Sequence, residues 1–468
     1  MNKPIIKNFV YAFGAQVVSL AASLVITFIA SALIGVKQFA YWQLFLTYVT
    51  YVNISRLGLN DGLYLRLGGK KYEELDYGLL SHERQVFIGF QVVVAVSILT
   101  SILMFDLDGD RRFVLIACCI CIIIVNANGF LIYILQAVNL TRIYSVSVVL
   151  QNLTWFVAIA IIAFLKIYSY KVIIVMYIFG HLCASVYLIY HAKEIVKHRY
   201  VKLEDVLCDI KENIRCGIKL MIATYAGNLI IASARMIVDA SWGVEVFGYF
   251  SFSLTLANVF LTFINQVSII VFPALRRVRP EQQKSVYYML RNTLSFILPF
   301  VMLGYLPITI FVQLYLPQYS QSLVFLPIFL PICTFDGKMQ MMCSSFFKSM
   351  RKESTLLRIN LMTMGFSIVM ALIGSFLVKN IYFVALGILL VVALRSIVSE
   401  IILAKNMGVS IRWELFQEIT VVTLFVVGSM IFPATVVFFL YLIIYSAYLF
   451  VNKDRVKVLL ERGRSFNE

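Results

Sequence analysis

The chain has 468 residues, of which 61% are hydrophobic and only 14% are charged, and its mean hydropathy is +0.89. This composition excludes a soluble globular protein. The formal net charge of +16 is compatible with a nucleic-acid partner. The distribution of the charges along the chain shows whether nucleic-acid binding or membrane topology explains it.

Long apolar runs recur from one end of the chain to the other, and each is long enough for a membrane-spanning helix. We expect an all-α integral membrane protein with about fourteen spans, or twelve if some are not separate. The first run is too long for a cleaved signal peptide and is interpreted as an uncleaved helix. The expected spans are 9–34, 39–60, 85–105, 113–137, 143–165, 170–190, 214–239, 246–272, 288–312, 321–347, 355–378, 381–404, 415–431 and 434–451.

The expected spans divide the basic residues unequally between the two sides of the membrane. Most of the 40 Lys and Arg residues fall in loops on the side of the N-terminus, and few fall on the opposite side. Positive loops stay in the cytoplasm, so both termini are expected there. The basic excess then reflects membrane topology and contact with anionic lipid head groups, and we expect no nucleic-acid partner.

An internal repeat relates the two halves of the chain. The segment Gly35–Trp42 returns as Gly243–Phe250, 208 residues later, and Leu46-Thr47 matches Leu254-Thr255 at the same spacing. Six expected spans separate the copies, so both halves have the same orientation and form a parallel repeat. Two six-helix bundles related by a pseudo-two-fold axis are predicted, with a substrate site between them near mid-membrane.

The repeat also sets the expected domain boundaries. An N-lobe of six transmembrane helices covers 1–190, and a C-lobe of six covers 214–404. Between them, 191–213 is predicted to be an amphipathic linker on the cytoplasmic membrane surface, because its apolar residues recur at helical spacing. The remainder, 405–468, is expected to hold a pair of C-terminal helices and a basic cytoplasmic tail.

Polar side chains fall on narrow faces of several expected spans. Any one of them is explained by hydrogen bonding between helices, but matching stripes in both repeats favour a shared polar cavity. The candidate lining residues are Gln16, Gln43, Thr47, Asn53, Thr224, Asn228, Ser251, Thr255 and Asn258.

Ionisable residues inside the spans are the candidates for substrate binding. A charge at mid-bilayer is costly, so it usually faces water or a partner. The cations Arg56, Arg235, Lys338 and Arg395 outnumber the well-embedded carboxylates Asp239 and Asp336, with Glu400 near a helix end. This balance favours an anionic substrate, and arginine suits phosphate in particular. An internal ion pair, above all between Arg235 and Asp239, is the alternative.

The sequence offers no catalytic site. It contains no glycine-rich phosphate loop, no paired carboxylates in a soluble segment and no metal-ligand spacing, and its loops are short. The eight cysteines are expected to be structural thiols. We therefore predict a transporter with no cofactor and no metal, rather than an enzyme or a scaffold.

The chain resembles the polysaccharide (O-antigen and capsule, Wzx-type) flippases of the multidrug/oligosaccharidyl-lipid/polysaccharide exporter (MOP) superfamily. The resemblance lies in Lys7–Phe9, in the repeated turn, and in Gly58–Gly62 followed by Arg66–Lys70. It extends over the whole chain in span number and loop placement.

This resemblance implies that the chain moves an undecaprenyl-diphosphate-linked oligosaccharide from the inner to the outer leaflet of a bacterial cytoplasmic membrane. Such a flippase supplies O-antigen, capsule or exopolysaccharide synthesis by alternating access around a cationic cavity, next to other polysaccharide-assembly membrane proteins. The diphosphate would meet Arg56, Arg235, Arg395 and Lys338. Coupling to H+ or Na+ would use Asp239, Asp336 or Glu400.

Two related functions stay open. A lipid II flippase would use similar physics and differs only in substrate. A multidrug/cation antiporter of the same superfamily would need an acidic residue within the lobe, whereas the first expected span contains no Asp or Glu. A membrane-embedded glycosyltransferase or polymerase is less favoured, because the chain has no large extramembrane loop for its catalytic groups.

Overall fold

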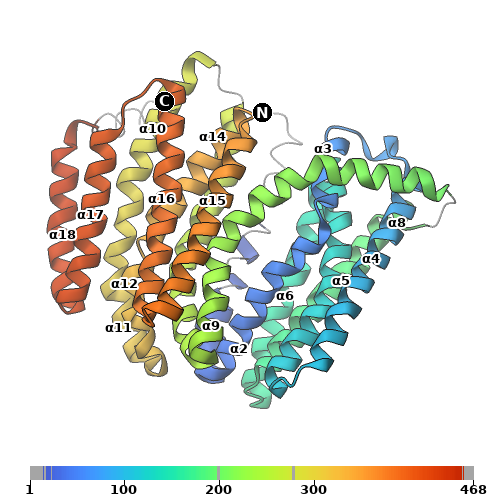
Figure 1. Cartoon of the computed structure of the whole chain (residues 1–468), viewed down its shortest axis with the longest axis horizontal. Coiled ribbons are helices and arrows are strands. Elements are labelled where there is room, and N and C mark those ends of the chain that lie inside the picture. Colours follow the sequence, from blue (N-terminus) through green and yellow to red (C-terminus); the bar gives the residue numbers. More distant parts are fainter. Residues whose placement is uncertain are drawn as a thin grey trace. The chain divides into compact units, whose positions relative to one another are not determined.

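In the computed structural model of the chain, helices are the only regular secondary structure among the described residues, which confirms the expected all-α membrane fold. The described residues are 14, 17–19, 21–22, 24–197, 201–276, 280–455 and 457. They form two compact units, Met1–Ala232 and Ser233–Glu468 (Figure 1).

Helices of the first unit follow the apolar runs of the sequence, because a helix satisfies its own backbone hydrogen bonds and can therefore cross a bilayer. Within this unit α4 packs against α5, and α6 packs against α7. The helix α9 (Leu203–Arg276) begins in the first unit and continues in the second. The preceding elements are η1 (Ile26–Ala30), α2 (Ser31–Val52), η2 (Asn53–Arg56), α3 (Leu59–Leu67), η3 (Tyr72–Glu74), α4 (Tyr77–Met104), α5 (Gly109–Ala137), α6 (Thr141–Leu165), α7 (Tyr170–His191) and α8 (Lys193–Val196).

The second unit contains several interrupted helices. Its main pairings are α15 with α16, α13 with α16, and α17 with α18. After α9 its elements are α10 (Pro280–Ile297), η4 (Leu298–Gly304), α11 (Tyr305–Tyr315), η5 (Pro317–Val324), α12 (Leu326–Phe329), α13 (Ile332–Lys338), η6 (Met339–Cys343), α14 (Ser344–Ser349), α15 (Glu353–Leu372), η7 (Ile373–Leu377), α16 (Ile381–Met407), α17 (Arg412–Ile431) and α18 (Ala434–Val451).

The repeated turn has the same backbone conformation in both copies. Gly35 breaks α2 with φ 73° and ψ 173°, and Gly243 breaks α9 with φ 81° and ψ 174°. Residues with a Cβ atom rarely adopt this combination of positive φ and extended ψ, so glycine is needed at both positions. The two copies of the segment therefore share a backbone conformation as well as a sequence, as an internal repeat predicts.

The span count differs from the expected fourteen. Among the described residues, ten helices are long and apolar enough to cross a membrane, and a pair bent by 53° between η5 and α12 adds one more. The difference has three causes. The predicted spans 214–239 and 246–272 both lie within α9, where the break at Gly243 separates them, so they are counted together as one long helix. The second predicted span is divided between α2, η2 and α3, and part of the span 9–34 lies outside the described residues.

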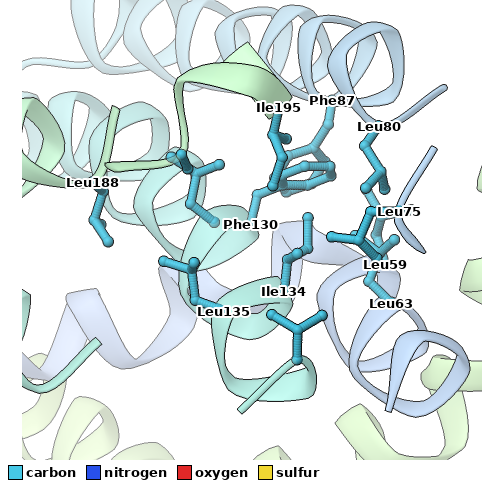
Figure 2. Packing of buried hydrophobic residues seen from close by; sticks show 13 residues of the cluster. Leu59, Leu63, Leu75, Leu80, Phe87, Phe130, Ile134, Leu135, Leu188 and Ile195 are labelled. Atoms are coloured by element: carbon cyan, nitrogen blue, oxygen red, sulfur yellow. The ribbon is translucent and has the colours of Figure 1, made fainter. Parts of the chain in front are cut away.

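The part of the predicted linker 191–213 that lies in α9 packs by one face against other helices of the first unit. Val206 is fully buried, and Ile210 and Ile214 contact a cluster of buried apolar side chains from α3, α4, α5 and α7. Figure 2 shows this cluster, in which the rings of Phe87 and Phe130 stack at 5.9 Å. Other apolar side chains of the linker helix, among them Leu203 and Leu207, are half exposed.

A glycine contact fixes α3 to α9 just beyond this cluster. A Cβ atom on Gly62 would lie 1.9 Å from the backbone oxygen of Asn213, and one on Gly217 would lie 2.0 Å from the oxygen of Gly58. Two backbones can approach this closely only where side chains are absent, as in the small-residue contacts of membrane helices. The segment Gly58–Gly62 is therefore a helix–helix contact as well as a turn.

The C-terminal helix α18 is held by three tyrosine hydroxyls. Tyr441, Tyr445 and Tyr448 donate hydrogen bonds to the backbone oxygens of Pro299, Phe296 and Ser295, at 2.9, 2.7 and 3.3 Å. Because Pro299 has no N–H, the carbonyl of Ser295 lacks its usual helical partner, and a tyrosine takes that place. Thus α18 is bonded to the break between α10 and η4.

Candidate substrate-binding site

Arg56 stands where the second predicted span breaks. The short helix η2 ends at this residue, and Leu57 and Gly58 follow with φ of 52° and 85°. The chain therefore changes direction directly after Arg56, before α3 begins. The Arg56 side chain is buried, with 7% of the residue exposed.

The partners of Arg56 are a neutral amide and an aromatic ring. Its Nε–H donates to Asn126 Oδ1 at 2.7 Å, and its Cζ lies 5.9 Å from the centre of the Tyr133 ring. A Cβ on Gly129 would lie 3.1 Å from Cζ, so this glycine leaves room for the guanidinium. Asp61 interacts with Arg56 electrostatically, but none of the described carboxylates forms an ion pair with it.

Arg395 makes a similar hydrogen bond to an asparagine, but it also forms an ion pair with a carboxylate. Its Nε–H donates to Asn360 Oδ1 at 2.8 Å, and its Nη1 lies 3.2 Å from Asp336 Oδ1. Arg395 is 5% exposed. The charge of Arg395 is thus balanced within the second unit, and the predicted coupling residue Asp336 is its counterion.

Lys338 belongs to a buried cluster of four charges, which we call the quartet: Arg291, Lys338, Glu400 and Glu418. Lys338 Nζ lies 2.9 Å from Glu400 and 2.5 Å from Glu418, while Arg291 Nε lies 2.5 Å from Glu400. All four side chains are at most 2% exposed. The quartet joins α10, α13, α16 and α17 and has no net charge.

The side chain of Arg235 connects the helical segments on either side of the repeated turn in the second unit. It lies before Gly243, and it contacts two residues after the turn: its Nε–H donates to Ser251 Oγ at 3.3 Å, and its Cζ lies 5.2 Å from the Phe247 ring. Asp239 lies one helical turn after Arg235 and is 5% exposed.

The predicted lining residues divide into buried and exposed ones. In the two repeats, Thr47 and Thr255 donate to the backbone oxygens of Gln43 and Ser251, both at 2.8 Å. These matched bonds, 208 residues apart, repeat the same helix-internal hydrogen bond. Gln43, Thr47 and Ser251 are buried and Asn53 and Thr255 are half-buried, whereas Thr224, Asn228 and Asn258 are exposed. Gln16 lies outside the described residues.

No family model matches the sequence, and no curated protein matches it. Solved structures match over most of the chain. The lipid II flippase MurJ, in an inward closed conformation, is 12% identical with a TM-score of 0.65, covering 96% of this chain and 100% of MurJ. An inward-facing multidrug resistance MATE family transporter of the MOP superfamily is 14% identical with a TM-score of 0.63, covering 84% and 94%.

A third match is a MOP superfamily transporter from Pyrococcus furiosus, described as having a binding pocket of reverse polarity. It is 13% identical with a TM-score of 0.53, covering 86% of this chain and 96% of that one. This chain has the fold of the MOP transporters. At these identities the likeness concerns the fold and not the substrate.

Within this MOP fold, the sequence-based prediction missed several residues that bond the buried charges, among them Arg291 and Glu418 of the quartet, Asn126, and Gln91, which accepts a hydrogen bond from Asn126 at 2.8 Å. Arg291 and Glu418 lie near the ends of their apolar runs, where charges usually reach the lipid head groups. Gln91 and Asn126 lie inside apolar runs and are fully buried. A polar residue in such a run was the available signal for these two.

Proposed function

We propose that this protein is a flippase that moves an undecaprenyl-diphosphate-linked oligosaccharide from the inner to the outer leaflet of the bacterial cytoplasmic membrane. The glycan would serve O-antigen, capsule or exopolysaccharide synthesis. Transport would proceed by alternating access of the two repeats, with both termini in the cytoplasm.

The observation that carries this proposal is the set of partners around Arg56, which is a neutral amide and an aromatic ring, with no ion pair to any of the described carboxylates. A buried guanidinium that has a neutral amide as its hydrogen-bond partner keeps most of its demand for an anion. A diphosphate meets that demand, because its oxygens accept parallel hydrogen bonds from guanidinium N–H groups. A lipid II flippase has the same fold, so the fold is compatible with moving a lipid-linked substrate.

The other candidate residues have different roles in this proposal. Arg235 and Arg395 would contact the diphosphate later in the transport cycle, and Lys338 would do so only if the quartet opens. Asp239, Asp336 and Glu400 are the proposed sites of coupling to H+ or Na+. Asp336 and Glu400 are paired with cations in the structure, so ion binding there would have to compete with these pairs.

The proposal is tested in a strain that lacks the gene. We expect loss of surface glycan, with undecaprenyl-linked repeat units accumulating on the cytoplasmic side. Accumulation of lipid II instead would identify a lipid II flippase. Normal glycan together with new sensitivity to cationic drugs would overturn the proposal and indicate an antiporter.

A further inference from the structure

A closed hydrogen-bond network lies behind Arg56. Asn126 of α5 donates through Nδ2 to Gln91 Oε1 of α4 and to Ser55 Oγ of η2, both at 2.8 Å. Gln91 Nε2 in turn donates to the backbone oxygen of Ser55 at 3.1 Å. Gln91 and Asn126 are both fully buried.

The network fixes the orientation of the Asn126 amide. Gln91 Nε2 is committed to a carbonyl, so Gln91 Oε1 must accept, and the group facing it must be the Asn126 NH2. Asn126 Oδ1 then faces Arg56 and accepts from its Nε–H. This bond holds the guanidinium through Nε and does not occupy its two terminal Nη groups.

Arg395 shows what changes when a carboxylate joins such an arrangement. Its Nε–H is also held by an asparagine, but Asp336 contacts its Nη1 and balances its charge. Both arginines donate their Nε–H to an asparagine, but only Arg395 has a carboxylate within ion-pair distance, since Asp61 interacts with Arg56 without forming an ion pair. The neutral character of the Arg56 network is therefore the feature that leaves its charge for a ligand.

We propose that Asn126 is a positioning residue, which holds Arg56 through a neutral amide oxygen and so reserves its positive charge for a diphosphate ligand. Gln91 and Ser55 act through Asn126 by fixing its amide. This inference rests on the proposed function, because it names the groups that prepare the same site for its substrate.

The test compares Asn126→Asp and Asn126→Ala in the full-length protein, purified in detergent. Asp is isosteric and keeps the bond to Arg56 Nε, but it brings a negative charge that neutralises the guanidinium. Ala removes the bond and leaves the charge. The probe is geranylgeranyl diphosphate, with Kd measured by titration and Tm measured on the same samples.

We expect Asn126→Asp to weaken probe binding about tenfold or more, close to the loss in Arg56→Ala, because charge-assisted hydrogen bonds are lost. Asn126→Ala should weaken binding less. In the Arg56→Ala background, Asn126→Asp should have no further effect on Kd.

A purely structural role for Asn126 predicts that Asn126→Ala weakens probe binding more than Asn126→Asp does, because Ala breaks the whole network and Asp keeps part of it. That order, or wild-type affinity in Asn126→Asp, would overturn the inference while leaving the proposed function intact. If Asn126→Asp does not fold, Asn126→Ala decides alone, and a loss as large as that of Arg56→Ala would overturn the inference. If wild type and Arg56→Ala bind the probe equally, the diphosphate role itself fails.

Discussion

Replacing Lys338 by methionine should strongly destabilise the second unit. In the quartet, Lys338 Nζ lies 2.9 Å from Glu400 and 2.5 Å from Glu418, and all these side chains are at most 2% exposed. Its removal leaves two buried carboxylates to share Arg291, whose Nη2 is 3.7 Å from Glu418. Leaving a buried charge without its partner typically costs about 3–5 kcal/mol, so we expect a loss of that size.

The compensating variant separates charge from packing. Lys338→Met/Glu418→Gln again has no net charge in the quartet, because Arg291 and Glu400 remain paired at 2.5 Å. We expect the double variant to recover most of the stability that Lys338→Met loses. The exposed Lys405, changed to methionine, is the matched control and should shift stability by no more than about 0.5 kcal/mol.

The assay is reversible unfolding of the purified protein in mixed micelles of dodecylmaltoside and SDS. The reasoning would be refuted if the double variant lost as much stability as Lys338→Met and Glu418→Gln lose together, since the quartet charges would then not interact. A loss below about 1 kcal/mol in Lys338→Met would refute the estimate as well, because that is the range of exposed ion pairs.

Three further changes have expected results in the same assay. Gly62→Ala should separate α3 from α9 and cost at least about 1–3 kcal/mol, because its Cβ would lie 1.9 Å from the Asn213 oxygen. Tyr445→Phe should cost about 0.5–1.5 kcal/mol, because it removes the 2.7 Å hydrogen bond to the Phe296 oxygen. Gly243→Ala should cost about 1–3 kcal/mol, because its φ of 81° and ψ of 174° lie in a region that residues with a side chain hardly ever adopt.

Matched controls exist for two of these changes. Gly89 lies in α4, and a Cβ atom added there would meet open space, so Gly89→Ala should leave stability unchanged or raise it. Tyr190 is 74% exposed, and Tyr190→Phe should be neutral. Equal losses in Gly62→Ala and Gly89→Ala would contradict the close contact of α3 and α9. Equal effects of the two tyrosine changes would contradict the anchoring of α18.

The features that sequence predicted well are those that leave a local mark. A span needs a long apolar run, and a backbone with positive φ and extended ψ needs glycine, so the helices and the turns at Gly35 and Gly243 could be located without the structure. The sequence also identified Arg56 and Arg395 as intramembrane cations, because charge is rare in such runs.

Pairing was not predictable in the same way. Glu418 and Lys338 are 80 residues apart, and Asn126 and Arg56 are 70 apart, so only the packing of helices brings them together. Sequence patterns therefore indicate that charges are buried but not which of them are balanced. That distinction separates Arg56 from Lys338 and Arg395, and it is the basis of the proposed site.

Transport by purified protein tests the central claim most directly. Wild type, Arg56→Ala and Arg56→Lys would be reconstituted in liposomes that carry an undecaprenyl-diphosphate-linked oligosaccharide, and its exposure at the outer leaflet would be followed with a lectin or a glycosidase. We expect translocation by wild type, none above empty liposomes for Arg56→Ala, and partial recovery for Arg56→Lys, because lysine keeps the charge and loses the bidentate geometry. Equal translocation by wild type and Arg56→Ala would contradict the account.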